Sequence, residues 1–381
     1  MKVVVACGGT GGHTFPGLAV AEELRGRGHE VVVWSSGRDI ESSVMKRWTG
    51  PVFSTGARQL SAKNAFANIR AIFRCRGEMK RTKPDALLAM GSYSSLPPVL
   101  AARMAKVKVF LHEANTVPGK AVDFLSRFAD AVAISFDVTT KYLPGVKTVR
   151  TGLPVRADIS TGRRFDFIPP NAFVVFVTGG SQGAHAVNEL LRNALVMLKS
   201  ELDKRNQAAA KSSQSVNPSI CQSEQSVNPN NRTISPRPLY VIHQTGAKDE
   251  AEVIEAYSKV GLPSRVHAFE GEMANAFASA DIVVARAGAS TCFELAVCGK
   301  PALLIPLPTA MRNHQHFNAD AFAAKGAADE GIQAELAVRQ VCRYLLEKYD
   351  HPEHLGRMAE KMRSLGTPDA AAKVADLIEG K

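Results

Sequence analysis

Residues 3–24 read VVVACGGTGGHTFPGLAVAEEL, and this stretch decides the fold class. A continuous apolar run is typical of a buried parallel strand, and glycines directly after it allow a sharp turn and a close approach of the backbone to a ligand. Leu18, Ala21 and Leu24 share one face of the helix expected next. Because a helix N-terminus carries free N–H groups and a positive dipole end, the stretch predicts a phosphate site. A plain strand-to-helix connection is the alternative.

The glycine pattern narrows the class of ligand. Gly9-Thr10-Gly11 is followed by Thr14, and the second expected strand, 31–34, closes on Ser35. A dinucleotide fingerprint expects a third glycine there and an acidic residue after that strand, so a nicotinamide dehydrogenase is disfavoured. A P-loop is excluded, because no Lys-Ser or Lys-Thr follows the glycines.

The composition favours two domains and an anionic partner. The chain has 381 residues, 45% of them hydrophobic, and a formal charge of +11. Its six cysteines form no CxxC pair, so neither a zinc ribbon nor a disulfide framework is indicated. The start lacks a signal-peptide pattern, and no apolar run approaches the roughly 20 residues of a spanning helix. We expect a cytosolic protein, and binding to the surface of a membrane is compatible with this expectation.

Short apolar runs alternate with helical patterns along the whole chain, which predicts an α/β fold with parallel sheets. The strand, glycine turn and helix of the opening recur at 173–191, with Gly179-Gly180-Ser181-Gln182-Gly183-Ala184 as the turn. This repeat indicates two doubly wound, Rossmann-like domains facing a central cleft, 1–155 and 156–361. The strands are expected at 3–6, 31–34, 86–90, 107–111 and 131–134, then at 173–177, 240–243, 266–269, 282–285 and 302–305.

Two segments depart from this alternation. In residues 63–83, Phe66, Ile69, Ile72 and Phe73 share helical spacing among seven cations and one acid. This pattern fits either a core-facing helix with a solvated basic face or a surface that inserts into an anionic bilayer. Residues 208–238 repeat Gln-Ser-Val-Asn-Pro among polar residues, so we expect a disordered insertion there.

Polar residues follow several expected strands, where ligands bind parallel sheets. They include His112-Glu113-Ala114-Asn115, and Gly288-Ala289-Ser290-Thr291 with Glu294. Glu294 is expected in the first turn of a helix, where a carboxylate could bind ribose hydroxyls. Thr291 and Glu294 also have the spacing of a plain capping box.

The glycine turns, His112-Glu113-Ala114-Asn115, His243-Gln244-Thr245-Gly246 and residues 286–291 together resemble the MurG family of bacterial UDP-N-acetylglucosamine transferases. The resemblance spans nearly the whole chain. It implies a GT-B fold, with the donor in the C-terminal domain, the acceptor lipid on the N-terminal one, and a last helix, about 362–381, packed back on the first domain. It also implies peptidoglycan synthesis at the cytoplasmic face of the inner membrane, with anionic lipids bound through 63–83 and contacts to cell-wall synthesis and division proteins.

The resemblance also implies site roles, taken position by position. Thr10, Gly11 and Gly12 would lie near the donor and the acceptor pyrophosphate, Asn115 and Gln315 near the sugar, and Arg156 and Ser181 near the donor diphosphate. Ala289, Ser290, Thr291 and Glu294 would surround phosphate and ribose. The sequence departs from the family at 91–95, which has few glycines, at His314, where a Gln is frequent, at Glu270, where an apolar residue is usual, and in the insertion.

The expected reaction is an inverting transfer to the C4 hydroxyl of a lipid-linked N-acetylmuramoyl unit, which needs a base and a stabilised diphosphate. We expect His13 as base, with Glu113 as second candidate; His13 could instead orient the acceptor or cap a helix. No metal or other cofactor is expected, because a helix end and Arg156 can stabilise the diphosphate. Another GT-B UDP-sugar enzyme, a glycolipid transferase or a UDP-N-acetylglucosamine 2-epimerase, is the alternative. Nucleic-acid binding is disfavoured, because no recognised motif interleaves the charge with aromatics.

Overall fold

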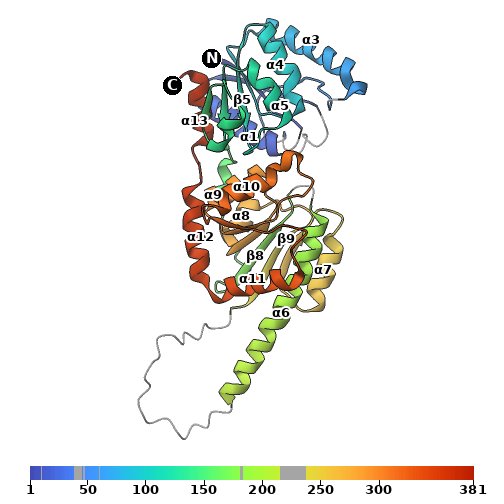
Figure 1. The fold of residues 1–381 in the computed structure, drawn as a ribbon, viewed down its shortest axis with the longest axis vertical. Helices are drawn as coiled ribbons and strands as arrows, with labels where there is room; N and C mark the ends of the chain where they lie inside the picture. The colour runs from blue at the N-terminus through green and yellow to red at the C-terminus, as the bar shows by residue number, and fades with distance from the viewer. Residues whose placement is uncertain (10, 38–44, 46–47, 60, 181–182, 215–236) are drawn as a thin grey trace.

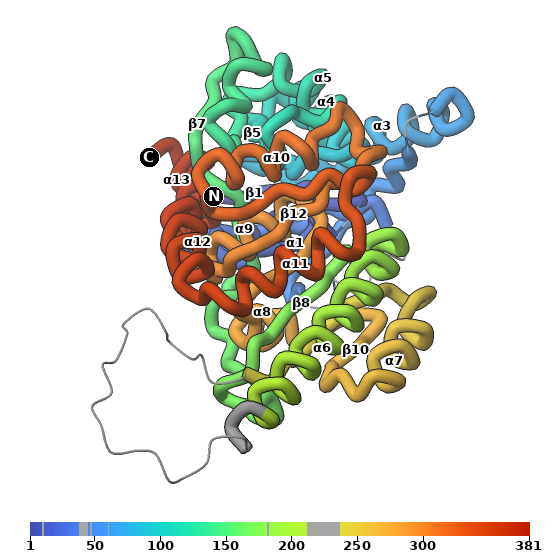
Figure 2. The backbone as a smooth tube through the Cα atoms, turned by 60° about the horizontal axis from the view of Figure 1, so that its bottom comes forward, coloured from blue at the N-terminus to red at the C-terminus, as the bar shows by residue number. Residues whose placement is uncertain are grey.

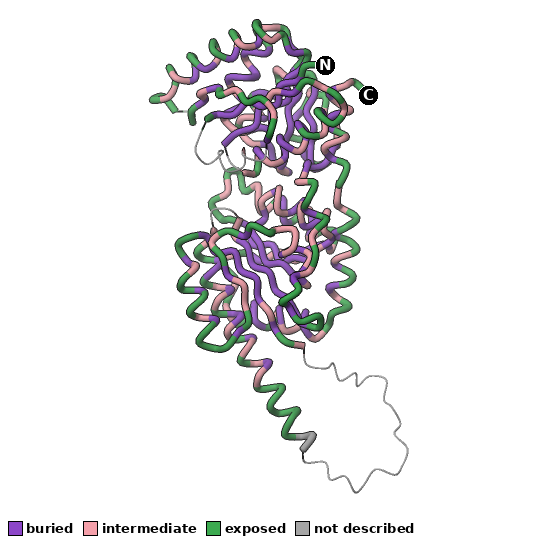
Figure 3. The backbone as a smooth tube through the Cα atoms, turned by 180° about the vertical axis from the view of Figure 1, so that it is seen from behind, coloured by how far each residue is buried: buried purple, intermediate pink, exposed green. Residues whose placement is uncertain are grey.

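The computed structural model describes the chain except residues 10, 38–44, 46–47, 60, 181–182 and 215–236. The described residues form two stacked α/β units, each built around one parallel sheet with helices on both faces (Figure 1). Figure 3 shows that the strands of both sheets are the most deeply buried parts of the chain. The two doubly wound units expected from the repeated strand, glycine turn and helix are therefore confirmed.

The first sheet runs in the order β3-β2-β1-β4-β5-β6-β7. Its strands are β1 (Lys2–Ala6), β2 (Glu30–Ser35), β3 (Val52–Ser54), β4 (Ala86–Ala89), β5 (Lys108–Glu113), β6 (Ala131–Ile134) and β7 (Thr148–Arg150). Helices α3 (Ala65–Thr82), α4 (Leu96–Met104) and α5 (Lys120–Leu125) pack on one face. Helix α1 (Gly11–Gly26) packs on the other. The strand order reverses between β1 and β4, so the first glycine turn lies where such sheets bind ligands.

The second sheet repeats this plan in the order β10-β9-β8-β11-β12-β13. Its strands are β8 (Phe173–Thr178), β9 (Leu239–Gln244), β10 (Ser264–His267), β11 (Ile282–Ala285), β12 (Ala302–Leu304) and β13 (Ala328–Glu330). One face carries α6 (His185–Gln214) between α7 (Glu250–Lys259) and α11 (Val338–Asp350) (Figure 2). The other carries α8 (Met273–Ser279), α9 (Ala289–Cys298), α10 (His314–Ala323) and α12 (Pro352–Ser364).

The chain crosses between the units twice, and the crossings touch. Gly152 follows β7 with φ of +82°, and a Cβ there would lie 2.0 Å from Thr367 Oγ1 on the returning segment, so a side chain has no room. The return leads into α13 (Ala370–Glu379), which packs against α1 in the first unit (Figure 1). Arg27 Nη1 donates to Asp376 at 2.5 Å and to Glu379 at 3.0 Å.

Several expectations need correction. Residues 362–364, expected in a last helix over 362–381, end α12 instead, and only Ala370–Glu379 packs back. Residues 208–214, expected in the disordered insertion, continue α6; residues 215–236 lie outside the described part, and Arg237 is held by Tyr349. The short strands β3, β7 and β13 were not predicted.

Helix α3 turns its large apolar side chains outward. Phe66, Ile69 and Phe73 are 78%, 51% and 58% exposed, whereas Asn68, Ala71, Cys75 and Met79 form the buried face. The helix therefore does pack on the core, but the alternative in which Phe66, Ile69 and Phe73 form its core face is wrong. The helix lies on the outer side of the first unit (Figure 1).

Candidate active site

The first glycine turn is tied to the turn after β4. Gly9 has φ of +109°, a conformation that side chains rarely adopt, and a Cβ there would lie 3.1 Å from Ser92 Oγ. Ser92 and Ser94 donate from Oγ to the carbonyl of Gly8 at 2.9 and 3.0 Å. The N-terminus of α1 and residues 91–95 therefore line one side of the same cleft. The turn at 91–95, which has few glycines, is held to the first glycine turn by its serines.

The N-termini of α1 and α9 meet across the two units. Ser290, in the first turn of α9, donates from Oγ to the carbonyl of Gly12 at 3.4 Å. The N-cap of α9 is Gly288, and no side chain caps the helix. Two positive helix ends thus lie close together, an arrangement that favours an anionic group.

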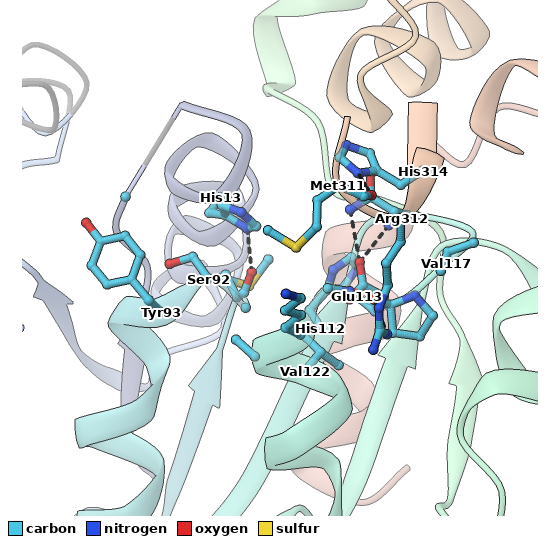
Figure 4. A pocket seen from close by; sticks show the side chains of 18 of the residues that line it. His13, Ser92, Tyr93, His112, Glu113, Val117, Val122, Met311, Arg312 and His314 are labelled. Atoms are coloured by element: carbon cyan, nitrogen blue, oxygen red, sulfur yellow. Dashed lines mark hydrogen bonds between the residues drawn. The ribbon is translucent and has the colours of Figure 1, made fainter. Parts of the chain in front are cut away.

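His13 holds one ring nitrogen in a fixed hydrogen bond. Its Nδ1 lies 2.8 Å from the carbonyl of Met90, and because a carbonyl only accepts, Nδ1 carries the hydrogen (Figure 4). Burial lowers the pKa of His13, so the ring is neutral and Nε2 keeps its lone pair. Nε2 has no hydrogen-bond partner among the described residues. An imidazole in this state can accept a proton at Nε2.

Glu113 is occupied on both sides by its own loop. Oε1 accepts from the backbone N–H and the side-chain amide of Asn115 at 2.9 and 3.1 Å, and Oε2 accepts from the N–H of Gly119 at 2.9 Å. Burial raises the pKa of this carboxyl, and these donors oppose the shift. Both oxygens already accept hydrogen bonds, so the arrangement favours a structural role in the 114–119 loop over the role of base.

Asn318, on α10, joins this loop to the second unit. Its Oδ1 accepts from the N–H and hydroxyl of Thr116 at 3.0 and 3.1 Å, and its Nδ2 donates to Asn115 Oδ1 and to the carbonyl of Ala287, both at 3.1 Å. Asn318 is fully buried. All its hydrogen bonds are satisfied, so it fixes which way the Asn115 amide points.

A cavity of about 480 Å³ opens between the units beside His13 (Figure 4). The first unit contributes residues of both glycine turns, His112, Glu113, Asn115 and the 117–122 segment, and the second contributes Met311, Arg312 and His314. The walls combine Met90, Val117 and Val122 with polar groups. Such a cavity fits a ligand with both apolar and hydroxylated parts.

His112 faces the same cavity from the end of β5. Its Nε2 donates to the carbonyl of Gly152 at 3.0 Å, at the first crossing between the units. Its Nδ1 is buried and has no partner among the described residues. Burial lowers the pKa of His112 to about 4, so the ring is neutral at pH 7.

Arg156 and Glu294 lie together near α1. Arg156 Nη2 is 3.4 Å from Glu294 Oε1, and the guanidinium lies 5.1 Å from the centre of the Phe15 ring. Burial raises the pKa of Glu294, and Arg156 opposes that shift. Glu294 is the sixth residue of α9 and not in its first turn, and Thr291 lies inside the helix, so the expected capping box does not form.

The remaining expected site residues are either undescribed, located in α9 or partly hydrogen-bonded. Thr10 and Ser181 lie outside the described residues. Ala289 is buried at the start of α9, beside Thr291. Gln315 accepts from the N–H of Leu307 at 2.9 Å through Oε1, and its amide nitrogen has no partner in the described part of the chain.

Three features of the site were not predicted from sequence. Asn318 and Arg312 lie in a mostly polar stretch of the sequence, 312–318, but nothing in that stretch shows that their side chains contact the first unit. Glu270 pairs with Arg265 through oxygens 2.8 and 3.1 Å away, so its side chain is engaged beside the loop after β10.

Metal ligands do not gather in the cleft among the described residues. One group, His351, Glu353 and His354, could hold a cation, and it lies at the junction of α11 and α12 on the surface of the second unit.

Comparison with known proteins places these features in a family. Residues 3–134 match the glycosyltransferase family 28 N-terminal domain, and residues 174–378 match its C-terminal domain. A UDP-N-acetylglucosamine--N-acetylmuramyl-(pentapeptide) pyrophosphoryl-undecaprenol N-acetylglucosamine transferase of Geotalea uraniireducens is 33% identical over 99% of this chain and 97% of its own length. A protein of the same name from Microcystis aeruginosa is 33% identical over 100% and 97%.

Solved structures agree. The crystal structure of Acinetobacter baumannii MurG has a TM-score of 0.73 at 30% identity, covering 100% of this chain and 99% of that one. The UDP-GlcNAc 2-epimerase of Neisseria meningitidis, bound to UDP-GlcNAc, has a TM-score of 0.69 at 15% identity, covering 100% of both chains, which shows a shared fold alone.

Proposed function

The chain belongs to glycosyltransferase family 28, and we infer that it moves N-acetylglucosamine from UDP-N-acetylglucosamine to undecaprenyl-pyrophosphoryl-N-acetylmuramoyl-pentapeptide, a step of peptidoglycan synthesis. The observation that carries this inference is the similarity over the full length to transferases of that name, at 33% identity. The cleft supports it, because convergent helix ends, a neutral histidine and a mixed apolar and polar cavity lie together in it.

His13 is the proposed base. Nε2 takes the proton of the acceptor C4 hydroxyl as its oxygen attacks C1 of the donor sugar, and UDP leaves from the opposite face with inversion. The hydrogen bond from Nδ1 to Met90 holds the tautomer that this step requires. The donors that occupy both oxygens of Glu113 argue against its role as alternative base.

The donor is proposed to lie against the second unit. Diphosphate charge would be stabilised by Arg156 and by the N-termini of α9 and α1. Glu294 would accept from the ribose hydroxyls, and Gln315 and Asn115 would bind the sugar. Gly11 and Gly12 would lie near the phosphates, and the same role is proposed for Thr10 and Ser181, which lie outside the described residues.

The outer face of α3 is the proposed membrane contact. Phe66, Ile69 and Phe73 form an exposed apolar stripe, with cations such as Arg70 and Lys80 exposed around it. Apolar side chains insert at the headgroup boundary, and cations attract anionic lipids. No described helix is both long and apolar enough to cross a bilayer. We therefore propose peripheral attachment at the cytoplasmic face of the inner membrane.

The test is UDP release from UDP-N-acetylglucosamine by the purified protein, with and without a short-chain lipid acceptor, in buffer containing EDTA and in buffer containing Mg²⁺. Acceptor-dependent release with a new disaccharide lipid supports the function, and equal rates in the two buffers support a metal-independent reaction. Acceptor-independent conversion of the donor to its 2-epimer would refute the transferase.

A further inference from the structure

The turn before α10 reaches from the second unit across the mouth of the cavity. Met311 and His314 line the cavity, and His314 Nδ1 donates to the carbonyl of Met311 at 2.8 Å. Between them, Arg312 and Asn313 both adopt left-handed backbone, with φ of +52° and +53°. Two consecutive residues other than glycine in this region are costly, so the surroundings must hold the turn in place.

Arg312 helps to hold the turn by donating two hydrogen bonds to the first unit. Its Nη2 donates to Asp123 Oδ2 at 2.8 Å, in the first turn of α5, and its Nη1 donates to the carbonyl of Pro118 at 3.2 Å (Figure 4 shows Arg312 beside Val117 and Glu113). The segment that Arg312 contacts is also held from the inside, because Glu113 accepts from the N–H of Gly119 at 2.9 Å. Two hydrogen bonds from Arg312 thus tie the turn to the opposite unit.

The position of this contact distinguishes it from the rest of the interface. Asn318 and Thr116 join the units in a fully buried network, whereas the side chains of Arg312 and Asp123 are 41% and 43% exposed. An exposed ion pair is weak, screened by salt and quick to break. Such a pair therefore breaks and re-forms at little cost in free energy.

We propose that Arg312 and Asp123 form a latch that closes the second unit over the acceptor cavity, with Arg312 as a positioning residue that brings Met311 and His314 to its mouth. The expected change in acceptor KM rests on the proposed transferase function, whereas the expected change in hydrogen exchange does not. Closing the latch favours the arrangement in which acceptor and donor meet. Loss of the latch should raise the acceptor KM and leave the affinity of the second unit for the donor unchanged.

The first test is independent of catalysis. Hydrogen exchange is measured on the full-length protein without substrates, for the wild type, Arg312→Ala, Asp123→Ala and the double variant. Exchange in residues 114–125 and 306–317 should rise about two- to fivefold in all three variants, because an exposed pair contributes that much. Arg205→Ala is the matched control, because Arg205 pairs with Asp350 at 3.0 Å with similar exposure, 46% and 37%. Exchange equal to that of the wild type in these segments would overturn the latch.

The second test uses steady-state kinetics with the lipid acceptor and calorimetry with UDP-N-acetylglucosamine. Each single variant should raise the acceptor KM about two- to fivefold, and the double variant no further, while the donor Kd stays unchanged. The charge swap Arg312→Asp with Asp123→Arg should recover part of the loss, which an effect of either residue apart from the ion pair would not allow. Additive effects of the single changes, or an equal change in donor Kd, would overturn the proposal. If the wild type transfers no sugar, the proposed function fails, and the exchange comparison still decides the latch.

Discussion

Replacing the three outward side chains of α3 by alanine should release the protein from anionic membranes. Phe66, Ile69 and Phe73 are 78%, 51% and 58% exposed, so each has most or half of its surface left to bury. Full burial of such a side chain is worth roughly 1.5–3 kcal/mol, and the three together therefore gain roughly 3–5 kcal/mol on insertion. The triple variant should bind vesicles about 10²- to 10³-fold more weakly.

The assay is co-sedimentation with large vesicles of phosphatidylcholine, with and without one third phosphatidylglycerol, at low and physiological salt. The wild type should bind the anionic vesicles and lose affinity as salt rises, because the cations of α3 contribute through screened charge. Fold should be preserved, since the buried face of Asn68, Ala71, Cys75 and Met79 is untouched.

The matched control is Ile254→Ala with Met197→Ala, which removes side chains 44% and 38% exposed on the second unit. This control should bind as the wild type does. Equal binding of the α3 variant and the wild type would refute the assignment of this face to the membrane.

Three further predictions concern the cleft. Replacing Glu294 by alanine should raise the donor KM roughly 10- to 100-fold, because charge-assisted hydrogen bonds to the ribose would be lost. An unchanged donor KM would contradict the proposed binding of ribose by Glu294. Replacing His13 by glutamine should lower kcat by about 10²- to 10⁴-fold and leave the donor KM unchanged. In the wild type, the midpoint at which kcat/KM declines in acid should lie below pH 6.5, because burial lowers the pKa of His13 and keeps its basic form present to lower pH. Burial lowers the pKa of His112 to about 4 in the folded chain, so between about pH 6.5 and 4 only the unfolded chain binds this proton. The share of His112 in the free energy of unfolding, about 3 kcal/mol, should be present above pH 6.5 and be lost over that range, where buried His243 acts in the same direction. A urea stability that does not change over this range would contradict the prediction.

Much of the fold follows from local patterns. The apolar runs at 3–6 and 173–177, each followed by glycines and a helical period, specify two strand–turn–helix units. Nine of the strands lie where such runs predict them, because parallel strands that are buried on both faces read as continuous apolar stretches. The edge strand β10, predicted at 266–269, lies at Ser264–His267. The strands β3, β7 and β13 have three residues each and lie toward the sheet edges, so they carry no such signal.

Other errors came from patterns that two structures share. The spacing of Phe66, Ile69 and Phe73 is equally that of a core face and a solvent face, and the small residues Ala71 and Cys75 in fact pack inward. Thr291 and Glu294 have capping-box spacing, but α9 begins at Ala289, three residues earlier than that motif requires. The polar residues 208–214 continue α6, whose buried face begins at Val187.

The sequence by itself determined the parallel sheets, the two glycine turns and the family, because these depend on residues close together in the chain. Only the tertiary structure decided which nitrogen of His13 is free, which depends on Met90, 77 residues away. It likewise decided that Asn318 reaches Thr116 across 202 residues and that Arg312 reaches Asp123 across 189. Hydrogen bonds and ion pairs need their atoms within about 3 Å, and periodicity along the chain carries no information about distances between residues so far apart.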